Sequence, residues 1–358
     1  MIDREKINRT LIRIAENAIE IYGKNPFEYP SGKNGPHNDK VTNCRIISHY
    51  FIIFYHLYKI SGDKKYKEWC FAAINHILNN IYEKGYFFLN RETKGKDSNN
   101  GLIGQVWCIE PIIIGSDFVN KRQLEIVKKV IRGHNFSDKH YLFRYPQVIG
   151  NKINYRISYT LNQQIWFSTI VSKFNDVFGT TLLGEETYTF NQNILRYIKI
   201  SNQGLLNNLI KLEGGNNYCI SLKNDSKKIF KVIIRSLTKE QKYLKASYSL
   251  FSLIGIVNNK DLRYQFEVKY DIKNLFKKHL TNKLLLSDRN QFSWGYNVTG
   301  IELARLEKAI DGKLSEEVKH ILMRQIQARP VFKIPDDVTY KARLYEMVYL
   351  VNNYKDFY

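Results

Sequence analysis

The chain has 358 residues, of which 44% are hydrophobic and 25% charged, a composition that excludes a disordered or fibrous protein. It carries 55 Lys and Arg residues against 34 Asp and Glu residues, which gives a net charge of +21. The basic residues are scattered and form no long run, so the pattern disfavours a nucleic-acid partner. A basic cleft can concentrate an anionic substrate, and an anionic small molecule or glycan is the partner we expect.

No stretch of about 18 consecutive apolar residues occurs, so we expect no membrane span. Acidic residues interrupt the first 22 positions, where a signal peptide needs an apolar core. These features predict a cytoplasmic chain. Cys44, Cys70, Cys108 and Cys219 form no CxxC pair and are expected to be buried free thiols. No HExxH, P-loop or GxGxxG motif is present, so we expect no metal and no cofactor.

A helical hairpin is the strongest pattern along the chain. Residues 4–22 predict an amphipathic helix. Residues 45–60 are apolar nearly all round and predict a buried inner helix, which ends at the turn Ser61-Gly62-Asp63. Residues 64–82 then repeat apolar side chains at spacings of three and four, which is typical of an outer helix with one wet face.

The same pair of helices recurs four more times. Inner candidates at 101–117, 161–178, 244–257 and 298–310 precede outer candidates at 121–133, 183–200, 260–280 and 314–328. The last inner candidate, 339–353, has no following partner and pairs with the N-terminal helix. Six hairpins that close a ring predict an all-α (α/α)6 toroid, formed as a single domain by residues 1–358.

Irregular segments fall where a toroid has its inter-hairpin loops, at 23–44, 83–100, 134–160, 201–243 and 281–297. Within the insertion 201–243, the alternating residues 215–238 predict a small β-hairpin. A two-domain chain divided near residue 200 is the alternative. It is disfavoured because the hairpin pattern continues on both sides of that point.

Polar residues near the start of an otherwise buried helix need a reason, because burying an unpaired polar group costs about 1–3 kcal/mol. In a toroid these positions converge on one mouth. Aromatic rings that cover a sugar face and amides or carboxylates that bind hydroxyls suit a saccharide there. The predicted substrate-binding residues are His37, Arg45, Gln105, Trp107, Gln164, Trp166, Tyr296, Asn297, Arg343 and Glu346.

Three stretches carry a resemblance to a known family. Gly104-Gln105-Val106-Trp107, seven residues after Asp97, resembles the D-x-S-x-W-x-R-G-Q-A-W signature of unsaturated glucuronyl hydrolases. His37-Asn38-Asp39 and the turn Ser61-Gly62-Asp63 look like two further motifs of that family. Those toroid enzymes hydrate the double bond of an unsaturated uronic acid. The resemblance implies Asp97 as the acid/base and Asp39 as its assisting carboxylate.

A second resemblance covers more of the chain. Asn34-Gly35-Pro36, Gly101 to Gln105, Asn162 to Trp166, Tyr296-Asn297 with Glu302, and Ala342 to Glu346 are similar to a toroid family of bacterial surface-polysaccharide gene clusters. This resemblance also implies a carbohydrate substrate.

Glycoside hydrolysis needs one protonated carboxyl and one carboxylate. The main candidates are Asp39, Asp97 and Glu302. Glu110 and Glu346 are further candidates. Asp39 could instead cap the first inner helix, and Trp107 and Trp166 could be core residues. We therefore expect a glycoside hydrolase that acts on a surface polysaccharide or its acidic fragments. The alternatives are a lyase or epimerase, with Tyr296 and His37 as bases, or a non-catalytic glycan-binding protein. The sequence leaves the oligomeric state open.

Overall fold

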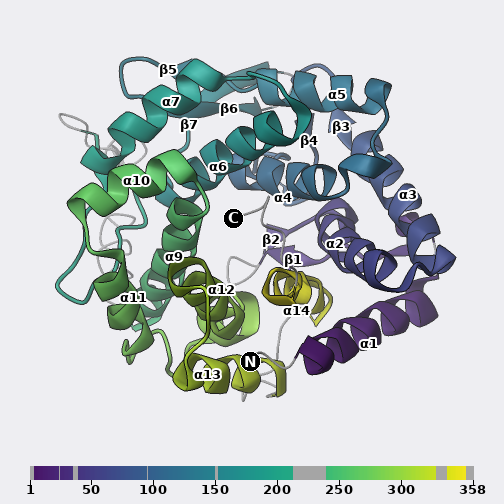
Figure 1. The fold of residues 1–358 in the computed structure, drawn as a ribbon. Helices are drawn as coiled ribbons and strands as arrows, with labels where there is room; N and C mark the ends of the chain where they lie inside the picture. The colour runs from purple at the N-terminus through teal and green to yellow at the C-terminus, as the bar shows by residue number, and fades with distance from the viewer. Residues whose placement is uncertain are drawn as a thin grey trace.

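The computed structural model describes residues 4–23, 25–34, 39–94, 96–149, 152–212, 239–327 and 337–351. Within them, helices form an inner and an outer ring around one axis, as Figure 1 shows. This confirms the predicted all-α toroid. The inner ring consists of α2 (Asn43–Ser61), α4 (Gly101–Ile114), α6 (Leu161–Phe178), α9 (Lys239–Val257), α12 (Thr299–Asp311) and the segments α14 (Asp337–Arg343), η6 (Leu344–Met347) and α15 (Val348–Val351).

The outer ring follows the predicted ranges closely. It consists of α1 (Arg4–Tyr22), α3 (Lys64–Asn79), α5 (Lys121–Arg132), α7 (Gly184–Asn193) with η4 (Ile194–Tyr197), α10 (Lys260–Lys269) with α11 (Ile272–Leu280), and α13 (Glu316–Gln327). The predicted single helix 260–280 is in fact two helices. Asp271 breaks it, because its side chain accepts a hydrogen bond from the Asn274 N–H and caps α11.

Neighbouring inner helices pack against one another around the ring. α2 contacts α4, α4 contacts α6, α6 contacts α9, and α9 contacts α12; α14 and η6 then contact α2 and close the ring. Every residue of α4 is buried, whereas α5 buries only Val127, Val130 and Ile131. The difference matches the sequence pattern, since inner helices are covered on all sides and outer helices on one.

Glycine ends three of the inner helices. Gly62, Gly179 and Gly312 follow α2, α6 and α12 with φ angles of 70°, 60° and 72°, a left-handed conformation that a side chain disfavours. The outer helices α3 and α10 then begin at Asp63 and Asn259, whose side chains accept backbone hydrogen bonds. At Gly62 and Asp63 the two caps are adjacent and turn the chain from α2 to α3.

Three of the segments predicted as irregular contain short antiparallel strands. β1 (Lys33–Asn34) pairs with β2 (Asp39–Lys40), and β3 (Ile81–Tyr82) pairs with β4 (Phe87–Phe88). β5 (Phe136–Ser137), β6 (Leu142–Ile149) and β7 (Lys152–Ile157) form a three-stranded sheet. The expectation of loops at 23–44, 83–100 and 134–160 is therefore wrong in part. The hairpin predicted at 215–238 lies outside the described residues.

The structure also bears on the expected state of the cysteines and on the apolar length of the helices. Cys44, Cys70 and Cys108 are buried free thiols, as predicted, with the sulfurs of Cys44 and Cys108 3.7 Å apart. Cys219 lies outside the described residues. Among the helices of the described ranges, none has both the length and the apolar character that a membrane crossing requires.

Candidate functional site

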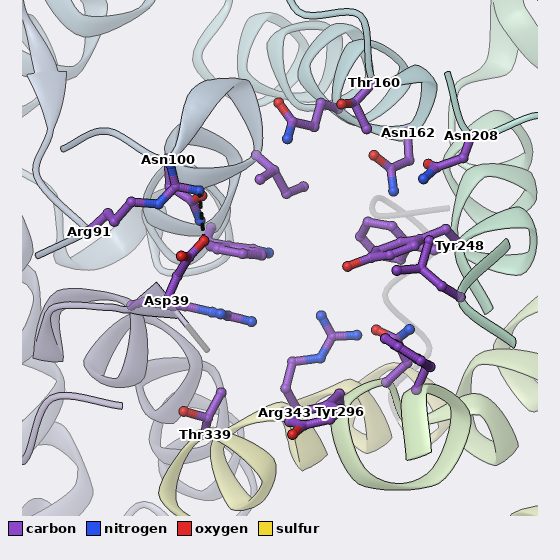
Figure 2. A pocket seen from close by; sticks show the side chains of 18 of the residues that line it. Asp39, Arg91, Asn100, Thr160, Asn162, Asn208, Tyr248, Tyr296, Thr339 and Arg343 are labelled. Atoms are coloured by element: carbon purple, nitrogen blue, oxygen red, sulfur yellow. Dashed lines mark hydrogen bonds and ion pairs between the residues drawn. The ribbon is translucent and has the colours of Figure 1, made fainter. Parts of the chain in front are cut away.

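The first turns of the inner helices surround a cavity of about 360 Å³. Figure 2 shows side chains from opposite sides of the ring pointing into it. Asp39 and Arg91 lie on one side, Asn162 and Tyr248 on another, and Arg343 below them in this view. Of the predicted site residues, six line the cavity: Asp39, Arg45, Trp107, Tyr296, Asn297 and Arg343.

The charge of this lining is strongly positive. Four cations contribute to it, Arg45, Arg91, Lys96 and Arg343, whereas Asp39 is the single carboxylate among the described lining residues. The remaining polar groups are amides and hydroxyls, and the rings of Trp107, Phe251, Phe292 and several tyrosines supply apolar surface. Such a lining suits a ligand that combines hydroxyl groups, an apolar face and a negative charge.

The strands at the mouth determine where Asp39 lies. Asp39 pairs with Asn34 across β1 and β2, and the next residue but one, Val41, forms a bridge with Arg91. The bridge places the Arg91 side chain beside Asp39, with 3.5 Å between Arg91 Nη2 and Asp39 Oδ2. Lys96 Nζ makes an ion pair with Asp39 Oδ1. Asp39 is 4% exposed, so its carboxylate is held by two cations at the cavity wall.

Asp97 lies behind Arg91 and does not line the cavity. Its Oδ1 is 2.9 Å from Arg91 Nη1, and its Oδ2 accepts a 2.8 Å hydrogen bond from the Gly101 N–H at the start of α4. One carboxylate oxygen thus binds the Arg91 side chain, and the other binds the backbone N–H at the start of α4. The acid/base role that the resemblance implies for Asp97 has no support in this geometry, because the cation stands between its carboxylate and the cavity.

Gln105 and Gln164 perform the same structural task on two successive inner helices. Oε1 of Gln105 accepts from the Phe88 N–H, and its Nε2 donates to the carbonyl oxygens of Phe88 and Asn99. The Gln164 amide makes the equivalent bonds with Phe143 and with the Ser158 carbonyl. Both side chains are fully buried. Neither side chain is among the described residues that line the cavity, and each amide fastens an inner helix to the strands before it.

The two predicted sugar platforms differ. Trp107 lines the cavity, and the Arg45 guanidinium lies 3.6 Å from its ring centroid, a cation–π contact that orients the cation. Trp166 does not line the cavity. It stacks on Phe251 and donates from Nε1 to the Phe251 carbonyl, so it supports Phe251, which faces the cavity in its place.

Glu302 and Glu346 lie beneath Arg343 and outside the cavity lining. Arg343 Nη2 is 3.1 Å from Glu302 Oε1 and 2.6 Å from Glu346 Oε1, and Arg305 Nη1 is 2.6 Å from Glu346 Oε2. Burial, with the charge of Glu346, raises the pKa of Glu302 to about 8. Neither Glu302 nor Glu346 is among the described lining residues, so their roles in catalysis and in substrate binding stay predictions. Glu110 is also remote, since it accepts hydrogen bonds from Tyr345 and Tyr349.

Tyr296 and Asn297 reach the cavity from the end of η5 (Phe292–Tyr296), a short π-helical segment before α12. His37 lies outside the described residues. The lining residues that were not predicted include Arg91, Lys96 and Tyr248. Arg91 and Lys96 belong to the charged loop just before Asp97, which was a usable signal. The place of Tyr248 at the cavity follows from the direction in which α9 faces. Burial raises the pKa of Tyr248, and the charges of Arg45 and Arg343 act against that rise.

Among the described residues, no three His, Cys, Asp or Glu side chains gather as a metal site would require. No protein-family model matches the chain. Archaeal glycosylation protein Q of Haloferax volcanii is 28% identical over 141 residues, which cover 39% of this chain and 38% of that protein's length. The similarity to this curated relative is thus partial for both proteins.

Two solved structures are similar across nearly the whole chain. One is an unsaturated glucuronyl hydrolase variant with dGlcA-Glc-Rha-Glc, at 10% identity and a TM-score of 0.39, covering 97% of this chain and 96% of that one. The other is an inactive variant of an α-1,6-mannanase of Salegentibacter sp. with α-1,6-mannotriose, at 9% identity and a TM-score of 0.40, covering 97% of this chain and all of that one. At these TM-scores the similarity says nothing about the chemistry of this chain.

Proposed function

We propose that the protein is a carbohydrate-active enzyme, most similar in kind to a glycoside hydrolase, that acts on an acidic saccharide in the central cavity. The lining carries the proposal, because it combines four cations and one carboxylate with aromatic rings and amides. The rings can cover the apolar face of a sugar, the amides can bind its hydroxyls, and the cations can bind its acid group. The glycosylation named in the archaeal relative supports a saccharide ligand.

For hydrolysis, Asp39 is the group that we propose to take part in proton transfer. It is the carboxylate of the described lining, and its ion pairs with Arg91 and Lys96 fix its direction. An ionised carboxylate in this position can take a proton from a water molecule that attacks the glycosidic carbon. The two-carboxylate mechanism also needs a proton donor for the leaving oxygen. The phenols of Tyr248 and Tyr296 are O–H groups of the lining that could supply it.

The excess of cations favours a second candidate, elimination or epimerisation of a uronic acid. A guanidinium that neutralises the sugar carboxylate makes the proton on the adjacent ring carbon easier to remove. A tyrosine of the lining would take that proton. In elimination the C–O bond on the next ring carbon then breaks, a C=C double bond forms, and the leaving oxygen takes up a proton. In epimerisation a second O–H group of the lining delivers a proton to the opposite face of the carbon.

Product analysis distinguishes these reactions. The purified protein is incubated with acidic and neutral oligosaccharides, and the products are followed by mass spectrometry and ultraviolet absorbance in water and in heavy water. Fragments that gain one water molecule mean hydrolysis. Unsaturated fragments mean elimination, and deuterium uptake without cleavage means epimerisation. Binding without any of these changes would refute an enzyme and favour a glycan-binding protein.

A further inference from the structure

A cluster of buried charges lies directly under the cavity, and the proposed reaction does not use it. It consists of Glu302, Arg305, Arg343 and Glu346, which we call the sub-cavity cluster. Each of the four side chains is at most 4% exposed. Glu346 bridges the two guanidiniums, with its Oε2 at Arg305 and its Oε1 at Arg343. Glu302 adds a second carboxylate at Arg343.

Stability does not explain why four charges are buried here, since apolar residues of similar volume usually serve a core as well or better. The contacts with Arg343 suggest a different purpose. Both carboxylates meet the same nitrogen, Nη2, at 3.1 Å and 2.6 Å. The carboxylate contacts of Arg343 thus run through Nη2, while Arg343 lines the cavity and its guanidinium points into it in Figure 2. One end of the cation is clamped and the other faces the ligand space.

We propose that Glu302 and Glu346 are positioning residues that hold Arg343 so that its Nη1 binds an anionic oxygen of the substrate, the carboxylate of a uronic acid. This inference rests on the proposed function, and it assigns the acid-binding position to one edge of one guanidinium. A planar guanidinium held by the Glu346 carboxylate and by a carboxyl oxygen of Glu302 has a fixed direction, which a flexible lysine ammonium would lack.

Other charged and titratable groups of the packed elements face this cluster. They are Arg45 and His49 from α2, Glu110 from α4, Lys173 from α6, Tyr248 from α9, and Tyr345 and Tyr349 beside Glu346. Burial lowers the pKa of Lys173 to about 7, so this lysine also titrates near neutrality. Its effect must be separated from that of Glu302.

The clamp makes acid binding depend on pH in a defined direction. An ionised Glu302 competes with the ligand for the charge of Arg343, whereas a protonated Glu302 does not. Since the pKa of Glu302 is raised to about 8, the carboxyl holds its proton below that pH and loses it above. Affinity for an acidic sugar should therefore fall as the pH rises through about 8, with no such change for a neutral sugar.

Calorimetric titration of D-glucuronate and D-glucose tests the proposal. For the unmodified protein, the glucuronate affinity should fall by up to about tenfold from about pH 7 to about pH 9, as release of one proton allows. Glu302→Gln, which imitates the protonated carboxyl, should bind glucuronate with little change over that range. Glu307→Gln is the matched control, since this carboxylate of the same helix accepts from the Ser315 N–H. Lys173→Met should keep the fall if it originates in Glu302.

A fall in glucuronate affinity that persists in Glu302→Gln would overturn the positioning role while leaving the proposed function intact. If Glu302→Gln does not fold, Arg343→Lys replaces it. A lysine ammonium is a compact charge without the planar fork of a guanidinium, so the preference for glucuronate over glucose should be lost. An unchanged preference would equally overturn the proposal. Failure of the unmodified protein to bind or convert any saccharide would instead refute the proposed function.

Discussion

Two aspartates that the sequence presents as a catalytic pair have different surroundings. Asp39 lines the cavity, whereas Asp97 is shielded by Arg91 and caps α4. Both lie in polar loops before inner helices, so sequence reasoning could select them but could not separate them. The distinction comes from the bridge between Val41 and Arg91, a contact between distant segments that no local pattern records.

Asp39→Asn should reduce kcat/KM by about a hundredfold or more, since general acid–base catalysis contributes about 10²–10⁴-fold. The unfolding temperature should also fall, because this variant loses the ion pairs of Asp39 with Arg91 and Lys96. Asp97→Asn should lower the unfolding temperature through the lost ion pair with Arg91 and the weakened cap at Gly101, while kcat/KM changes little. Activity assays and thermal unfolding of both variants decide this. Full activity in Asp39→Asn would contradict the assigned site.

At the scale of elements, the helices could be predicted and the role of several of their polar residues could not. Helical periodicity is local, so the ranges of the inner and outer helices follow from the sequence. The amides of Gln105 and Gln164 look like ligand-binding groups until their partners at Phe88 and Phe143 are known. The two-residue strands β1 to β5 escaped prediction because they have too little pattern of their own, whereas the longer β6 and β7 lie in a segment that was expected to be irregular.

Gln164→Leu should lower the free energy of unfolding by about 1–3 kcal/mol for each buried backbone group that loses its partner. The groups concerned are the Phe143 N–H and carbonyl and the Ser158 carbonyl. Urea unfolding measures the loss. Gln327→Leu, at an exposed position near the end of α13, should leave the stability unchanged. Equal stability of the two variants would show that the amide does not fasten the strands.

Gly104→Ala tests how closely α4 approaches the loop before it. A Cβ at residue 104 would overlap the backbone oxygen of Asn99 and the amide of Asn90. Because the backbone cannot yield cheaply, we expect a loss of about 1–3 kcal/mol from overpacking. Gly184→Ala is the control, since a Cβ there meets nothing within 4 Å. Denaturant unfolding should give a lower free energy of unfolding for Gly104→Ala than for Gly184→Ala. An unchanged free energy of unfolding in Gly104→Ala would contradict the close approach.

For the whole molecule, buried histidines should limit stability in acid. Burial lowers the pKa values of His134 and His279 to about 4. The unfolded chain takes up these protons below about pH 6.5, whereas the folded chain resists until about pH 4, so folding weakens as the pH falls between those values. Urea unfolding at several pH values should show the loss, and His279→Gln should reduce it. His320→Gln, at an exposed position, should not.

The ring itself could be read from the sequence because six hairpins of one pattern allow few other arrangements. The charge of the cavity could not, because Arg91 and Lys96 enter it from a loop whose path depends on the strands at the mouth. The position of the sub-cavity cluster likewise depends on the packing of α12 against the last inner segment, a contact between separate elements of the ring.

A crystal structure of the Asp39→Asn protein with an acidic oligosaccharide tests the central claim most directly. The account predicts a sugar ring in the cavity between residue 39 and Tyr248, with its carboxylate at Nη1 of Arg343 and with no occupancy when a neutral oligosaccharide of equal length is used at the same concentration. A saccharide bound elsewhere, or a neutral one bound equally well in the same place, would contradict it.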